Sequence, residues 1–306
     1  MKEKSLLRGH LLMLAASVMW GLMAPLGKDA MSHGISGLEM ITFRVSGAAL
    51  CFWIASFVLK LKGEPAQEER LTKKDYCGLL GAALFAIIFN QCNYIIGLSI
   101  TSPLNASIMT TVMPIFTMVM AFIFLREPIT WMKFGGVILG ACGAATLILA
   151  SANGAIGGGV LKGDLMCVAA QCSYSIYLTA FKGVIQKFSA VTCMKWMMTF
   201  ATIIVLPFSA PQFLATDWSA IATGVWLDTL FVVFCGTFCA FLFSVTAQKV
   251  LRPTIVAMYN YMQPVVSCTA SVLLGIGVLS WSHPVAIALI FTGVYLVNRS
   301  RAKGSN

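Results

Sequence analysis

Amide and thioether side chains lie at helical spacing inside an apolar segment that covers residues 103–125. Asn105, Met109 and Met113 are four residues apart and therefore share one face of a helix. An amide donates and accepts hydrogen bonds, and methionine adapts its shape to an apolar group. This face could bind a small solute that has a polar and an apolar part. Helix packing explains the pattern equally well, because amides also bond across helix interfaces.

A related face recurs in a later apolar segment, residues 253–276. The positions 150 residues further along the chain are Ile255, Tyr259 and Gln263, and Asn260 flanks them. Amides and a phenol provide the same mixture of hydrogen bonding and apolar contact. We therefore expect both segments to line one cavity.

Four other apolar segments contribute side chains that we expect at the same cavity. A polar group is costly against lipid and tends to face the interior of a helix bundle. Asn93 and Tyr94, by contrast, lie close to the end of their segment and could simply face water. The further candidates for substrate binding are Trp20, Asn90, Gln171, Tyr174, Tyr177 and Thr237.

Two prolines and two cations are candidates for the moving parts and the charge of the site. Pro114 and Pro264 each remove a backbone hydrogen bond at matching places in the chain, which makes either a gate or a simple packing bend. Arg44 and Lys195 lie roughly six residues inside apolar segments. Each could attract an anionic group such as a carboxylate, or could extend toward the membrane surface.

Carboxylates are scarce in the apolar segments, and this bears on energy coupling. Proton-driven carriers usually need a buried carboxylate. Glu39 and Asp228 lie near segment ends, and Glu39 is close enough to Arg44 on a helix to pair with it. The sequence therefore favours facilitated transport or exchange, while a proton relay through one of these carboxylates stays open.

The sequence predicts no cofactor, no metal site and no enzyme. Nearly all of the 10 cysteines fall in apolar segments, and none forms a CxxC pair with another. Neither an HExxH motif nor a pair of acids in the middle of a segment is present, and no Walker lysine motif indicates ATP use.

The elements that must position these residues are long and apolar. Of 306 residues, 58% are hydrophobic and 10% are charged, which is too few charges to cover a soluble globule. Each segment can cross a bilayer as a helix and lacks the alternation of barrel strands. We therefore predict an all-α membrane protein with ten transmembrane helices, at residues 9–28, 38–59, 76–97, 103–125, 131–150, 162–181, 190–209, 224–246, 253–276 and 281–298.

The distribution of Lys and Arg predicts the orientation. With both termini in the cytoplasm, 17 of these 21 residues fall on the cytoplasmic side. Lys28 and Lys162 fall on the opposite side, and Arg44 and Lys195 lie within segments. The net charge of +10 thus reflects topology and not a nucleic-acid partner. We expect a plasma membrane or a bacterial inner membrane.

The two parts of the chain repeat each other. Pro114 and Trp131 recur 150 residues later as Pro264 and Trp281. Five segments is an odd number, so the second part must enter the membrane from the opposite side. Inverted five-helix repeats around a central cavity are the usual architecture of secondary transporters. The predicted units are residues 1–150, a glycine-rich linker at 151–159, and residues 160–306.

The chain resembles the drug/metabolite transporter superfamily, in its ten-span form with two EamA-type domains. The resemblance is carried by Ala15–Gly21, Arg44, Leu125–Pro128 and Gly135–Gly143. One departure is Gly277, which stands where the second repeat would match Glu127. The resemblance implies a basket-like bundle with a central cavity, and export or uptake of small metabolites, amino acids among them.

These observations predict a secondary transporter that moves small organic metabolites by alternating access, with export favoured. The alternative is a membrane sensor or assembly partner that carries no flux. The expected partners are a small-molecule substrate and membrane lipid. The GxxxG pattern of Gly136 and Gly140 indicates close helix packing, either within the chain or in a homodimer.

The topology makes a direct prediction for the C-terminus. A reporter fused after Lys303 should read as cytoplasmic, because ten crossings return the chain to the side on which it began. Paired reporters that are active on opposite sides of the membrane measure this. An external reading would rule out the ten-span count.

Overall fold

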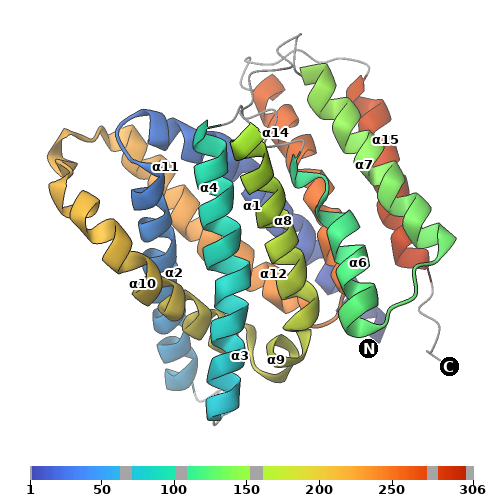
Figure 1. Ribbon diagram of the computed structural model, residues 1–306, viewed down its shortest axis with the longest axis horizontal. Coiled ribbons are helices and arrows are strands. Elements are labelled where there is room, and N and C mark those ends of the chain that lie inside the picture. The colour runs from blue at the N-terminus through green and yellow to red at the C-terminus, as the bar shows by residue number, and fades with distance from the viewer. Residues whose placement is uncertain (1, 63–70, 101–108, 152–160, 274–281, 301–306) are drawn as a thin grey trace.

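All regular secondary structure in the described part of the chain is helical. The structure is a computed structural model, and no strand occurs among the residues described. The helices run side by side in one bundle (Figure 1). The prediction of an all-helical fold is confirmed. The structure describes residues 2–62, 71–100, 109–151, 161–273 and 282–300, and the candidate Asn105 lies outside them.

Side-chain caps fix where two early helices begin. Ser36 and Glu39 form a capping box at the start of α2, and Thr72 and Asp75 form one at the start of α3. Each box provides partners for backbone N–H groups that the helix itself leaves unpaired. The helices of the first part are α1 (Lys2–Ser32), α2 (Gly37–Leu61), α3 (Lys73–Ala83), η1 (Leu84–Phe89), α4 (Asn90–Ile100), α6 (Met113–Leu125) and α7 (Trp131–Ser151).

The second part of the chain forms a comparable series. Ser189 caps its longest helix by accepting a hydrogen bond from the backbone N–H of Thr192. The helices are α8 (Leu161–Ala180), α9 (Lys182–Lys187), α10 (Ala190–Ala215), η2 (Trp218–Ala220), α11 (Thr223–Val233), η3 (Phe234–Cys239), α12 (Ala240–Gln248), α13 (Pro253–Met258), η4 (Tyr259–Tyr261), α14 (Met262–Leu273) and α15 (Ser282–Arg299).

Five continuous helical stretches in the described ranges are long and apolar enough to cross a membrane. Large apolar side chains such as Leu61, Phe208 and Leu214 are exposed on the outside of the bundle. Such exposure is costly in water and natural in lipid. The five stretches are Lys4–Ser32, Gly37–Leu61, Lys73–Leu98, Ala190–Ala215 and Thr223–Gln248, and Met113–Leu125 and Ile287–Arg299 are shorter apolar helices.

Two helical stretches contain a π-helical turn at the same relative position. The turn η1 lies between α3 and α4, and η3 lies 150 residues later between α11 and α12. A π-turn holds one extra residue, and such turns occur often at functional sites. The matching positions extend the sequence repeat to an irregular feature of the backbone.

The helices α7 and α15 pack along one another at one side of the bundle (Figure 1). Their backbones approach closely where glycines meet. A Cβ atom added to Gly136 would lie 2.8 Å from the carbonyl oxygen of Gly293, which is too close for an ordinary contact. The GxxxG pattern therefore serves packing within the chain, and it offers no support for a homodimer.

Gly136→Ala should destabilise the protein, because the new methyl group overlaps the backbone of α15. Overpacking of this kind costs about 1–3 kcal/mol. Gly135→Ala is the matched control, since a Cβ at Gly135 meets nothing within 4 Å. Thermal unfolding in detergent, followed by intrinsic fluorescence, should show a lower midpoint for Gly136→Ala alone. Equal midpoints would contradict the packing described here.

Candidate functional site

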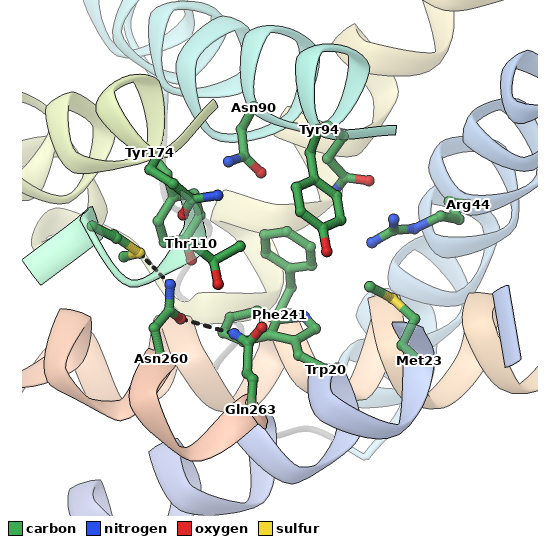
Figure 2. A pocket seen from close by; sticks show the side chains of 13 residues that line it. Trp20, Met23, Arg44, Asn90, Tyr94, Thr110, Tyr174, Phe241, Asn260 and Gln263 are labelled. Atoms are coloured by element: carbon green, nitrogen blue, oxygen red, sulfur yellow. Dashed lines mark hydrogen bonds between the residues drawn. The ribbon is translucent and has the colours of Figure 1, made fainter. Parts of the chain in front are cut away.

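Side chains from both parts of the chain surround a cavity between the helices (Figure 2). The cavity volume, measured as the space open to the centres of water molecules, is about 90 Å³. This is room for several waters or for part of a small solute. The lining side chains are Trp20, Met23, Arg44, Asn90, Gln91, Tyr94, Thr110, Met113, Gln171, Tyr174, Phe241, Asn260 and Gln263.

Two amides form one wall of the cavity. The side-chain N–H of Gln263 donates to Oδ1 of Asn260 at 2.9 Å, and Nδ2 of Asn260 contacts the sulfur of Met113 (Figure 2). The structure thus brings together residues from the two segments that the sequence pattern singled out. Because Asn260 is buried, its amide is held in one orientation by these contacts.

The amide wall lies where two helices are interrupted. Pro114 lies in the first turn of α6, and Pro264 lies in the first turn of α14, directly after the 3₁₀ turn η4. Pro264 thus lies inside the unbroken helical run of α13, η4 and α14, and Pro114 follows a turn at residues 111–112. Each proline adjoins an irregular turn in its helical segment, and its role as a gate or a packing bend stays a prediction. The backbone is irregular beside the cavity, where polar backbone groups can find partners other than lipid.

Aromatic rings also line the cavity. Trp20 makes edge-on contacts with Tyr174 and Phe241, with ring centroids 6.4 and 5.6 Å apart. These rings give the cavity a rigid apolar surface, because an aromatic side chain has few rotamers to lose. Tyr177 touches Tyr174 at a centroid distance of 5.2 Å but is buried in the core behind it.

Arg44 brings a positive charge to the cavity (Figure 2). Its side chain is buried, with 4% of the residue exposed, so extension toward the membrane surface is wrong for this cation. Its Nε–H donates to the hydroxyl of Thr237 at 3.1 Å. Thr237 in turn donates to the carbonyl of Val232, five residues earlier, at 2.8 Å. The π-turn η3 therefore presents the hydroxyl that orients Arg44.

The start of α4 supplies polar groups on the third side. Asn90 donates from Nδ2 to the carbonyl oxygen of Ala170 at 2.9 Å, which joins α4 to α8. Gln91 is buried, and its Oε1 accepts no hydrogen bond from the described residues. An unpartnered buried acceptor is costly. A solute with an O–H or N–H group would remove that cost.

Several residues expected at the cavity lie elsewhere. Tyr259 hydrogen-bonds to Nδ1 of His10 at 2.8 Å. Met109 packs with Leu98 and Cys167. Thr237 reaches the cavity indirectly, through Arg44. In each case the polar or soft side chain faces the interior, as predicted, but serves packing or orientation.

The expected pair of Glu39 and Arg44 does not form. Both carboxylate oxygens of Glu39 accept hydrogen bonds, one from the backbone of Ser36 and one from the hydroxyl of Thr216. Its position next to the cap of α2 explains this preference, since the carboxylate closes its own helix first.

The other two charged candidates do not line the cavity. Lys195 donates to Ser56 at 3.0 Å and lies over the ring of Trp53 at 4.7 Å. Asp228 lies beside Asp29 and His33, at the end of α1 that is remote from the N-terminus. Neither residue contributes its charge to the cavity wall.

Four lining residues escaped the sequence interpretation, and a fifth, Tyr94, was thought able to face water but lines the cavity. Gln91 is an amide inside an apolar segment, and Tyr94 lies four residues after Asn90 on the same helical face. Thr110 is three residues before Met113 and so lies on the same side of its helix. By contrast, Met23 and Phe241 are apolar side chains among other apolar side chains, and no sequence pattern marks them.

Comparison with known proteins agrees with this arrangement. The EamA-like transporter family matches the chain twice, over residues 7–149 and 161–299. An uncharacterized transporter of Archaeoglobus fulgidus is 25% identical over 288 residues, covering 92% of this chain and 95% of that protein. A probable terminal-alkyne amino-acid exporter of Streptantibioticus cattleyicolor is 24% identical over 273 residues, covering 87% and 85%.

A solved crystal structure shares the fold. Its TM-score is 0.72 at 18% sequence identity, and the match covers 94% of this chain and 95% of that chain. The family match and the apolar helices around the cavity indicate an integral, multi-pass membrane transporter, whose partners are a small molecule and lipid. The chain belongs to the EamA-like transporter family, within the drug/metabolite transporter superfamily, so the predicted resemblance is confirmed.

Proposed function

We propose that the protein is a secondary transporter that moves small organic metabolites by alternating access through the cavity. The observation that carries the proposal is the origin of the lining. Two interrupted helices, one from each part of the chain, meet at the cavity with Met113 and Asn260 in contact. Interrupted helices that meet at a central site are typical of transporters. Amino acids or related solutes, and export, are favoured by the name of the relative from Streptantibioticus cattleyicolor.

The architecture that we propose is ten spans in two inverted five-helix repeats. It is supported by the two family matches and by the recurrence of the π-turn 150 residues along the chain. The repeats are residues 1–150 and 160–306, with residues 151–159 as the linker. Both termini are proposed to be cytoplasmic, in a plasma membrane or a bacterial inner membrane, because Lys and Arg gather on one side.

The two parts of the chain are joined at one end of the bundle. Lys187 at the end of α9 forms an ion pair with Asp75 of α3 at 2.6 Å. Under the proposed topology this end is cytoplasmic. Release of this ion pair, with bending at Pro114 and Pro264, would open the cavity to the cytoplasm.

Energy coupling follows from the charges at the cavity. Among the described lining residues none is a carboxylate, and both Glu39 and Asp228 lie outside the lining. A proton carrier at the binding site would need such a group. We therefore favour facilitated transport or exchange over proton coupling. A sensor that binds the solute without moving it is the competing function, and flux separates the two.

Purified protein in liposomes should accumulate members of a broad panel of labelled small metabolites, amino acids included, above empty vesicles. Gln263→Ala should raise the half-saturating concentration about tenfold, because it removes one or two hydrogen bonds at the cavity wall. Gln186→Ala is the matched control, since Gln186 is an exposed amide on α9. Binding without flux across the panel would favour a sensor over a transporter.

A further inference from the structure

The cavity has a charge that the fold does not balance. Among the described lining residues, Arg44 is the one that carries a charge. A guanidinium stays protonated in proteins. Because Arg44 is buried, water does not screen its charge fully, and an anion in the cavity would interact with it strongly.

The described protein groups do not supply the missing counter-ion. Glu39 lies near Arg44 on the same helix, but both of its oxygens are already engaged by Ser36 and Thr216. The described ion pairs join other residues, namely His33 with Asp29, Lys133 with Glu127, and Lys187 with Asp75. A solute is therefore the natural source of the negative charge.

The orientation of Arg44 suits a carboxylate. Thr237 accepts the Nε–H at 3.1 Å, and this bond leaves the N–H groups of both terminal nitrogens without a described protein acceptor. The side chain points toward Tyr94 and the open space of the cavity (Figure 2). Two parallel N–H groups match the two oxygens of a carboxylate, which is the geometry of strong bidentate pairs.

A positively charged nitrogen, by contrast, finds no carboxylate among the described lining residues. Gln91 is one of these residues, and its buried Oε1 has no described hydrogen-bond donor. A hydroxyl or an uncharged N–H satisfies this acceptor without placing a second cation near Arg44. An ammonium group would lose its water and face a like charge.

We propose that the transporter selects small carboxylates that carry no positively charged nitrogen, with the carboxylate on Arg44 and a neutral donor on Gln91. The inference rests on the proposed function, because it assigns the charge of the solute that this cavity carries. Among small organic metabolites it favours monoanions such as 2-hydroxy acids, which are related to amino acids, over the zwitterionic amino acids themselves.

Matched solutes test the assignment in the reconstituted full-length protein at pH 7. Each set shares the side chain of alanine, leucine or phenylalanine and contains the 2-hydroxy acid, the amino acid and the amino-acid amide. Flux is measured for each, and binding is measured by thermal shift in detergent. The 2-hydroxy acids should bind at least about tenfold more tightly than the amino acids. The amino-acid amides should not compete with the 2-hydroxy acids for binding.

Variants locate the charge that makes the selection. Arg44→Gln should weaken binding of the 2-hydroxy acids at least about tenfold and remove the preference. Arg44→Lys keeps the positive charge but loses the two parallel N–H groups of the guanidinium. This variant should therefore still prefer the 2-hydroxy acids, with an affinity between those of the unchanged protein and Arg44→Gln. Lys60→Gln is the matched control, because it removes an exposed positive charge from the far end of the same helix.

The outcomes separate the two proposals. Flux of no compound in any set would count against the proposed function itself. Amino acids or amides carried as well as the 2-hydroxy acids would overturn the charge assignment and leave the transporter standing. So would an Arg44→Lys protein that folds normally and shows no preference. Melting curves of the unliganded variants identify any that fail to fold.

Discussion

Lipid cannot hydrogen-bond a peptide group, and this constraint organises the whole molecule. Wherever the chain faces lipid it must be a continuous helix, so irregular backbone is confined to the protein interior. The described interruptions follow this rule. The breaks before α6 and α14 adjoin the cavity directly, while η1 precedes the polar start of α4 and η3 carries the hydroxyl that orients Arg44. The cavity therefore lies beside the irregular turns of the helices.

The same constraint explains why one buried cation dominates the chemistry of the cavity. In water, the charge of Arg44 would be solvated and of little consequence. In the bundle, one hydrogen bond that Arg44 donates to the hydroxyl of Thr237 orients the side chain, and the described lining holds no opposite charge. A buried charge without a counter-ion is unfavourable. Under the proposal above, an anionic solute supplies the counter-ion, and selectivity by charge follows.

Sequence alone predicted the helices well and the cavity partly, for a physical reason. A polar side chain in an apolar segment must face inward, and this placed Asn90, Gln171 and Asn260 correctly in the interior. Inward, however, is not the same as cavity-facing, because Tyr177 and Tyr259 obey the same rule while packing against other helices. Phe241 lines the cavity without any polar signal. Pro114 was expected to disturb its segment, but the place of the disturbance, a turn at residues 111–112 directly before α6, is visible only in three dimensions.

The π-turns η1 and η3 also fix how the following helices are rotated. One residue corresponds to about 100° around a helix of 3.6 residues per turn. The extra residue in η1 therefore sets the angular direction of Asn90 and Gln91, which follow it immediately. Deletion of one residue from that turn would leave the sequence of α4 unchanged but rotate the helix about its axis, so that its side chains would meet different neighbours. The number of residues in the turn, more than the identity of any of them, therefore sets the rotation of α4 about its axis.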